Sequence, residues 1–365
     1  MALAAQASSR SYCIGKMPAP KKTFQVMRLR ARAITRVKLS VIIPVYNGGE
    51  GLELCLKALA ASVCPPDEII VVDDTSTDAS ASLAAKLGAT VLSLPDGPRG
   101  PARARNHGAA SAQGDVLVFL DADVVVHPDT LGRIKTYLTE LPEIAALFGS
   151  YDADPPAPGL VSRYKNLLHH YIHQHGRAEA STFWAGCGAI RRNVFSAVGG
   201  FDESYLSAAI EDIEFGARLR RGGYRIRLCP DIQVTHLKRW TFVSLLRADI
   251  FRRAVPWTRL ILRQGDWPRD LNVDVKSRLS ALSAWAALCF LVLGFGSSWA
   301  WWGLLPAITA LGLLNADLYG FFWRQGGPGF AVGAVALHAL YLIYSSLTFT
   351  VLAGQTWLRK LLAGL

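Results

Sequence analysis

The stretch VLVFLDAD, residues 116–123, joins five consecutive apolar residues to two carboxylates that stand two positions apart. A short, continuous apolar run is typical of a strand that is buried on both faces. Three further runs have the same character: residues 39–44, 68–72 and 90–94. The segments between them have helical patterns: residues 51–61, 77–87 and 101–112. This alternation predicts an α/β domain with a Rossmann-like, mostly parallel sheet, whose ligand site lies beyond the carboxyl ends of the strands.

Carboxylates follow two of these predicted strands directly. Asp121 and Asp123 can both reach one divalent cation, and oxygen ligands favour Mg²⁺ or Mn²⁺ over zinc. Asp73 and Asp74 can accept hydrogen bonds from a nucleobase or a ribose. The alternative for this second pair is a simple turn followed by a helix cap.

Charge is distributed unevenly along the chain. Residues 1–38 hold nine basic and no acidic residues, 39–158 hold seven basic and 16 acidic, and 159–278 hold 20 basic and 11 acidic. A nucleic-acid-binding protein is expected to have one continuous basic surface, so this pattern predicts no nucleic-acid partner. Residues 1–38 lack the apolar segment of a secretory signal, and we expect a disordered basic tail there. The six scattered cysteines indicate reduced thiols in a cytosolic compartment.

The C-terminal part of the chain is almost free of charge. Residues 279–316 and 325–358 contain no formally charged residue. Since a membrane span needs about 20 apolar residues, we expect a transmembrane segment over residues 279–355 with about three helices, at 279–296, 299–322 and 330–353. The alternative is a buried helical bundle of a soluble protein.

Residues 241–278, just before this segment, mix basic side chains with large apolar ones such as Phe251 and Trp257. This composition favours an amphipathic segment that lies on an anionic membrane surface. The positive-inside rule then places the preceding domain, residues 39–240, on the cytoplasmic side. These patterns predict a multi-pass protein of the inner or plasma membrane with a cytoplasmic catalytic domain.

Five motifs together carry a resemblance to a known family. They are VIIPVYN (41–47), VVDDTSTD (71–78), GPARARNHGAASAQGDVLVFLDAD (100–123), VGGFDE (198–203) and the pair Glu211-Asp212, which precedes EFGARLRRGGYRI. In order and spacing they resemble the signature of the family 2 glycosyltransferases over about residues 39–240. The resemblance implies a GT-A fold and an inverting transfer from a nucleotide-diphosphate sugar.

The resemblance also implies roles for individual positions. The residues that match those binding the nucleotide sugar are Pro44, Val45, Tyr46, Asp74, Arg105, Asn106 and Asp121. Asp123 and His236 match the positions that hold the metal, and Asp212 matches the catalytic base. Trp184, Gly186 and Glu211 match the acceptor side of the site.

Two positions depart from the family pattern. Thr75 stands where the family commonly has glycine, which puts the geometry of that turn in question. Of the Gln-x-x-Arg-Trp motif only Arg239-Trp240 is present, so a processive polymer synthase is not expected. His169 and His173 can share one helical face and chelate a metal. No neighbouring cysteine or acid completes such a site, which favours an ordinary helix.

The sequence thus predicts a membrane-bound glycosyltransferase with a cytosolic, UDP-linked donor and a hydroxyl of a lipid or lipid-linked molecule as acceptor. The metal neutralises the leaving diphosphate, and Asp212 takes the hydroxyl proton. Two alternatives stay open at this point. A polyprenyl-phosphate glycosyltransferase has an ionised acceptor and needs no base, and a non-catalytic membrane scaffold only binds nucleotides.

Overall fold

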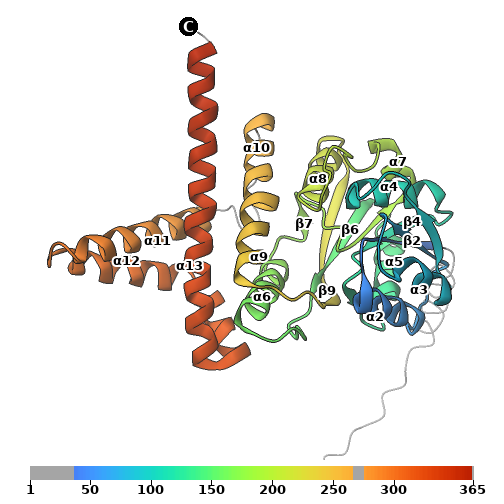
Figure 1. Ribbon diagram of the computed structural model, residues 1–365, viewed down its shortest axis with the longest axis horizontal. Coiled ribbons are helices and arrows are strands. Elements are labelled where there is room, and N and C mark those ends of the chain that lie inside the picture. Colours follow the sequence, from blue (N-terminus) through green and yellow to red (C-terminus); the bar gives the residue numbers. More distant parts are fainter. Residues whose placement is uncertain (1–36, 266–274, 364–365) are drawn as a thin grey trace, which may run out of the picture. The chain divides into compact units, whose positions relative to one another are not determined.

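The computed structural model describes residues 37–265 and 275–363. The predicted basic tail therefore lies outside the described residues except for its last two positions, and so do residues 266–274 of the predicted amphipathic segment. The described chain forms a sheet with helices on both faces, followed by a series of C-terminal helices (Figure 1).

The predicted parallel strands are confirmed. β1 (Leu39–Val45), β2 (Glu68–Asp73), β3 (Thr90–Ser93) and β4 (Val116–Leu120) are adjacent in the order β3-β2-β1-β4, and each pair is parallel. All residues of β4 are buried, as expected for a strand that is covered on both sides. The carboxyl ends of β1, β2 and β4 consequently meet at one edge of the sheet.

Three helices connect these strands, as the sequence predicts. They are α2 (Gly49–Ala60), α3 (Ser80–Lys86) and α4 (Pro101–Ser111). α3 begins three residues later than expected because Asp78 Oδ1 accepts a hydrogen bond from the Ser80 amide, 3.0 Å away, and forms a turn there.

The second half of the sheet is mixed. β8 (Cys187–Arg191) runs antiparallel to both β4 and β6 (Ile144–Tyr151), and β6 runs parallel to β9 (Arg225–His236). Two short strands, β5 (Val124–Val126) and β7 (Glu179–Ala180), run antiparallel to β9. β9 therefore carries its last residue, His236, back to the edge where β4 ends, because His236 pairs with Val124.

Further helices cover this half of the sheet: α5 (Thr130–Glu140), α6 (Leu160–Gln174), α7 (Arg192–Val198) and α8 (Glu211–Arg221). One apolar cluster packs on the sheet with Leu52, Leu59 and Ile134. A second cluster contains Phe119 and Phe215. The core therefore lies on both faces of the sheet, which fixes the strand ends that carry the polar side chains.

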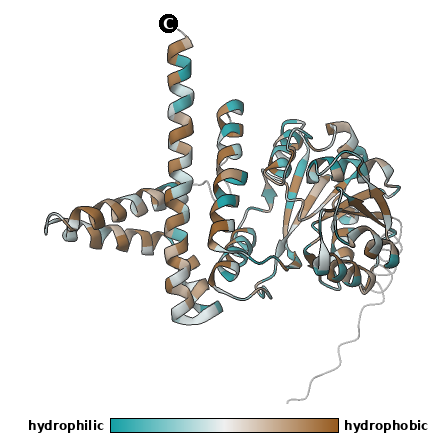
Figure 2. Cartoon of the chain, viewed as in Figure 1, coloured by the Kyte–Doolittle hydropathy of each residue, from teal (hydrophilic) through white to brown (hydrophobic). Residues whose placement is uncertain are grey.

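The C-terminal helices are α9 (Phe242–Arg247), the π-helix η1 (Ala248–Ala254), α10 (Val255–Gln264), α11 (Val275–Gly294), α12 (Ala300–Leu314) and α13 (Ala316–Ala363). Apolar residues dominate α11 and α12 (Figure 2). Among the described helices, α11 and α13 are long and apolar enough to cross a membrane. Three crossings stay a prediction.

The expected span over residues 299–322 is not one helix in the structure. α12 has 15 residues and ends at Leu314. The side chain of the next residue, Asn315, donates hydrogen bonds to Ser280 Oγ and to the Leu311 carbonyl. Residues 316–322 belong to α13, which is interrupted at Gly327 with φ 72°. The polar contacts of Asn315, which the hydropathy pattern did not reveal, end the helix early.

Candidate active site

One cavity of about 1200 Å³ opens at the sheet edge where β1, β2 and β4 end. Pro44, Val45, Tyr46 and Asp74 line it, as the sequence predicts for a nucleoside site. The Asp74 carboxylate is buried and accepts hydrogen bonds from the backbone amides of Arg99 (3.0 Å) and Gly100 (2.8 Å). Asp74 thereby holds the loop before α4 against the end of β2.

The turns that follow β1 and β2 have an unusual backbone. Asn47 and Thr75 both have positive φ values, 54° and 64°. Asn47 Oδ1 accepts a hydrogen bond from the Thr77 amide at 2.8 Å, and the Asn47 amide donates to Ser76 Oγ at 2.9 Å. At Thr75, where the family commonly has glycine, a β-branched residue therefore occupies the left-handed conformation that suits glycine.

A buried arginine links the carboxylates of the site. Arg105 of α4 donates from Nη2 to Asp121 Oδ1 at 2.7 Å and from Nη1 to Glu211 Oε1 at 2.8 Å. All three side chains line the cavity. The other carboxylate oxygen of Glu211 accepts from the Ala209 amide at 2.8 Å. Glu211 thereby anchors Arg105 at the cavity, and its acceptor-side role stays a prediction.

Asp123 and His236 approach each other as the predicted metal pair should. His236 Nε2 lies 3.6 Å from Asp123 Oδ2. His236 Nδ1 lies 2.7 Å from Asn166 Oδ1, which can only accept, so Nδ1 carries a proton and Nε2 is the ring nitrogen that faces Asp123. Burial opposes ionisation of Asp123, but His236 and Lys238 outweigh it and hold its pKa below the ordinary value.

This pair fits a divalent cation that keeps other ligand positions for water and phosphate oxygens, as Mg²⁺ does in phosphate sites. Within residues 37–265 and 275–363, no cluster of three His, Cys, Asp or Glu side chains offers a closed metal site. The alternative chelate of His169 and His173 is not supported, because no third His, Cys, Asp or Glu side chain of the described residues completes a metal site with them.

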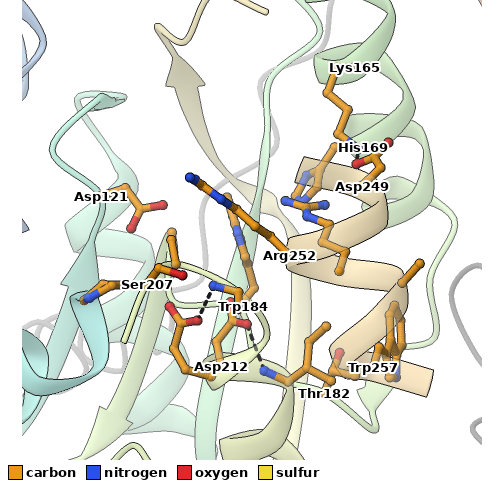
Figure 3. A pocket seen from close by; sticks show the side chains of 18 of the residues that line it. Asp121, Lys165, His169, Thr182, Trp184, Ser207, Asp212, Asp249, Arg252 and Trp257 are labelled. Carbon is orange, nitrogen blue, oxygen red and sulfur yellow. Dashed lines mark hydrogen bonds and ion pairs between the residues drawn. The ribbon is translucent and has the colours of Figure 1, made fainter. Parts of the chain in front are cut away.

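Asp212 stands in the first turn of α8 and lines the same cavity (Figure 3). Its carboxylate accepts hydrogen bonds from the backbone amides of Ala185 (3.2 Å) and Ile213 (2.8 Å). Burial, and next the negative charge of Glu211, raise the pKa of Asp212 to about 7, against the opposing charge of Arg105. A carboxyl group with such a pKa can take up a proton near neutrality.

Trp184 lines the cavity as part of an aromatic cluster. Its ring centroid lies 4.8 Å from that of Tyr151 and 5.0 Å from that of His169. A Cβ atom at Gly186 would stand 2.6 Å from the Trp184 ring, so only glycine fits there. The two predicted acceptor-side residues Trp184 and Gly186 thus both lie at the cavity and depend on each other.

Asn106 is the one predicted site residue that does not line the cavity. Its Nδ2 donates to the Phe201 carbonyl at 2.8 Å, and its Oδ1 accepts from the Phe201 amide at 2.8 Å. These bonds consume the amide, so the predicted nucleotide contact of Asn106 is replaced by a structural one. Asn106 joins α4 to the loop of the VGGFDE motif.

Sequence reasoning misses the cavity residues that come from the C-terminal helices. Arg252 and Arg253 of η1 and Trp257 of α10 line the same cavity as Asp212. The sequence pattern places them only in a basic, amphipathic segment. The mixture of basic and aromatic residues was the available signal, but it did not show which face of the helix turns toward the site.

Comparisons with known proteins agree with this geometry. Residues 40–199 match the model of "Glycosyl transferase family 2", and residues 166–240 match "N-terminal domain of galactosyltransferase". The chain is 26% identical over 236 residues to the O-antigen chain rhamnosyltransferase RfbN of Salmonella typhimurium, covering 60% of this chain and 74% of that protein. It is 28% identical over 208 residues to the probable glycosyltransferase YdaM of Bacillus subtilis, covering 53% of this chain and about half, 49%, of the relative.

A solved structure has the same fold. The mannosyltransferase PcManGT from Pyrobaculum calidifontis, in complex with GDP-Man and Mn²⁺, superposes with a TM-score of 0.55 at 19% identity. The match covers 87% of this chain and 94% of that one. The α/β architecture is thus a GT-A fold, and residues 40–199 of the chain form a domain of glycosyltransferase family 2.

Proposed function

We propose that this protein is a membrane-bound, inverting glycosyltransferase that moves a sugar from a nucleoside-diphosphate sugar to a hydroxyl of a lipid or lipid-linked acceptor. The observation that carries the proposal is a single cavity that contains Asp123, His236 and Asp212 and continues to the apolar helices α11 and α13. The proposed donor site, the proposed base and the apolar surface for the acceptor thus all line the same cavity.

The donor half of the cavity provides the contacts that a nucleoside diphosphate requires. Tyr46 and the loop held by Asp74 offer an aromatic ring and backbone groups beside the sheet edge. A divalent cation, Mg²⁺ or Mn²⁺, held by Asp123 and His236 would neutralise the charge that develops on the leaving diphosphate. PcManGT, which has the same fold, binds GDP-Man and Mn²⁺ together, and this supports the assignment. UDP-linked donors are the first to test.

Asp212 supplies the base for an acceptor hydroxyl. The acceptor oxygen bonds to the anomeric carbon, the bond from that carbon to the β-phosphate oxygen breaks, and the hydroxyl proton passes to Asp212. The nucleoside diphosphate leaves with the electron pair. The raised pKa of Asp212 makes this proton transfer favourable near neutral pH. Arg105 holds Asp121 and Glu211 in place beside the base.

The apolar helices support an acceptor of lipid character. α11 and α13 are both long and apolar enough for membrane crossing, and residues of both helices line the cavity. The relative RfbN is named for the O-antigen chain, which is consistent with an acceptor of the cell envelope. We propose an inner- or plasma-membrane location with the GT-A domain on the cytoplasmic side.

The experiment is nucleotide release by the full chain in detergent, with a panel of UDP- and GDP-linked sugars, with and without Mn²⁺ and a membrane lipid extract. Release should require one donor and the metal, and it should rise with the extract. Asp123→Ala should abolish release, and Asp212→Asn should lower it by about 10²- to 10⁴-fold. Asp129→Asn, an exposed carboxylate outside the cavity lining, is the matched control.

The outcomes separate the alternatives. Full activity of Asp212→Asn would indicate an acceptor that is already ionised, as in a polyprenyl-phosphate glycosyltransferase. Absence of release and of nucleotide binding with every donor would indicate a scaffold without catalytic activity.

A further inference from the structure

The cavity that begins at the donor site ends in an apolar groove between α10, α11 and α13. Its lining there includes Ile261, Ala281, Leu282, Trp285, Leu342 and Phe349. These six side chains offer contact area to an alkyl chain, and Arg278 of α11 adds one positive charge to the same part of the lining. An acceptor that reaches Asp212 from this side must therefore carry an apolar part.

Two arginines stand on the wall of the same cavity. Arg252 and Arg253 belong to η1, and Figure 3 shows the Arg252 side chain extending from its helix into the cavity. In residues 37–265 and 275–363, no carboxylate forms an ion pair with either guanidinium group. The π-helical turn that carries them is a rare conformation that occurs frequently at functional sites.

The nearest acid on this helix is already occupied. Asp249 Oδ1 accepts from Lys165 Nζ at 2.5 Å, and Asp249 Oδ2 accepts from the Tyr344 hydroxyl at 2.6 Å. Asp249, Arg252 and Arg253 are spaced i, i+3 and i+4, and all three line the cavity. This wall therefore carries three positively charged side chains, Lys165, Arg252 and Arg253, and one negatively charged side chain, Asp249. The excess positive charge favours the binding of an anionic group beside it.

We infer that the acceptor is an amphiphile in which a phosphate or diphosphate joins an apolar chain to the hydroxyl-bearing group. The chain occupies the groove at Leu282 and Phe349, the phosphate binds Arg252 and Arg253, and the hydroxyl reaches Asp212. Guanidinium groups match phosphate oxygens through paired N–H donors, which makes arginine suited to this contact. The inference deepens the proposed function and rests on it.

The test measures equilibrium binding of radiolabelled dodecyl phosphate to the full chain in nanodiscs of neutral lipid. The variants are Arg252→Gln, Arg253→Gln and the double variant. Arg259→Gln on α10 is the matched control, because Arg259 is exposed and lies outside this cavity lining. Unlabelled 1-dodecanol and inorganic phosphate serve as competitors. Binding of UDP and GDP with Mn²⁺ is measured on the same preparations.

We expect the double variant to weaken dodecyl phosphate binding by at least about tenfold, since hydrogen bonds between charged groups are lost. Arg259→Gln should stay within about twofold of the wild type, and neither competitor should displace the probe at equal concentration.

Several results would overturn the inference. These are displacement by 1-dodecanol or by inorganic phosphate, an equal loss in Arg259→Gln, and no probe binding by the wild type. A parallel loss of nucleotide binding in the double variant would assign the arginines to the donor. Failure of the proposed function is distinguishable, because the wild type would then bind no nucleotide at all.

Discussion

Thr75 is the residue at which local chemistry and backbone geometry conflict. Its φ of 64° places a β-branched side chain in the left-handed region, at a cost of about 1–2 kcal/mol. The surrounding bonds of Asp73, Asp74 and Asn47 hold the turn in this conformation. Strain of this kind persists only where neighbouring structure enforces it, here beside the donor site.

Replacing Thr75 with glycine should therefore stabilise the protein. Thr75→Gly should raise the free energy of unfolding by up to about 1 kcal/mol, because relief of strain exceeds the added freedom of the unfolded chain. Thermal unfolding in detergent measures the change. Thr75→Ala keeps the Cβ atom and is the control, which should give no gain. A glycine variant less stable than the alanine variant would contradict the strain argument.

The pKa of Asp212 predicts the pH dependence of the reaction. With a pKa raised to about 7, the carboxyl group is protonated below neutrality and cannot accept the hydroxyl proton. The value of kcat/KM should increase with pH around pH 7 and level off at higher pH. If the pKa of Asp212 were that of an ordinary aspartate, the increase would occur near pH 4.

Glu211→Gln tests the cause of this shift. Removal of the neighbouring negative charge should move the rise in kcat/KM to lower pH. Asp129→Asn should leave the profile in place, since Asp129 lies outside the cavity lining. A wild-type profile that is flat between pH 5 and 8 would show that Asp212 does not limit the reaction as a base.

Helix α13 is interrupted near its N-terminal end. Gly327 has φ 72° and is followed by Pro328. Arg163 of α6 donates from Nη2 to the Gln325 carbonyl at 2.9 Å, and its guanidinium lies 4.7 Å from the centre of the Phe330 ring. α6 therefore binds the carbonyl that the break leaves free and packs on the helix beyond it.

Two glycines at the break allow a matched test. A Cβ atom would meet nothing within 4 Å at either Gly327 or Gly329, but only Gly327 has a positive φ. Gly327→Ala should destabilise the protein by about 1 kcal/mol, whereas Gly329→Ala should be neutral or slightly stabilising within the helix. Thermal midpoints in detergent measure both changes. Equal effects of the two variants would contradict a conformational origin.

At the scale of the whole described chain, one buried polar group joins three elements. Lys165 of α6, Asp249 of η1 and Tyr344 of α13 are connected by the two hydrogen bonds of the Asp249 carboxylate. Burial lowers the pKa of Lys165 to about 8, although Asp249 opposes this shift. The GT-A domain and the long apolar helix are thus tied together by an interaction that is costly to break on one side only.

A double-mutant cycle tests this coupling. Asp249→Asn or Lys165→Met alone should destabilise the protein by about 3–5 kcal/mol, because each leaves a buried charge without its partner. The double variant should lose less than the sum of the two, and thermal unfolding measures all three. An exposed pair, Lys57 and Glu53, is the control and should contribute less than about 1 kcal/mol. Additive losses at Lys165 and Asp249 would contradict the coupling.

The parallel half of the sheet and the residues at its edge follow from the sequence alone. Continuous apolar runs such as residues 116–120 form strands buried on both sides, and the residues that follow must then lie at the strand ends. This is why Asp74 and Asp123 could be predicted to lie at one site, whereas Asp212, in the first turn of α8, was assigned to it only by the resemblance to family 2.

How side chains distant in sequence share their hydrogen bonds is visible only in the folded chain. Arg105 meets Glu211 across 106 positions, Asn106 turns to Phe201, and Arg252 enters the cavity from a segment that the sequence pattern places at the membrane surface. Periodicity and spacing report which face of an element is apolar. Hydrogen-bond partners depend on distances that packing sets, so no local pattern could assign them.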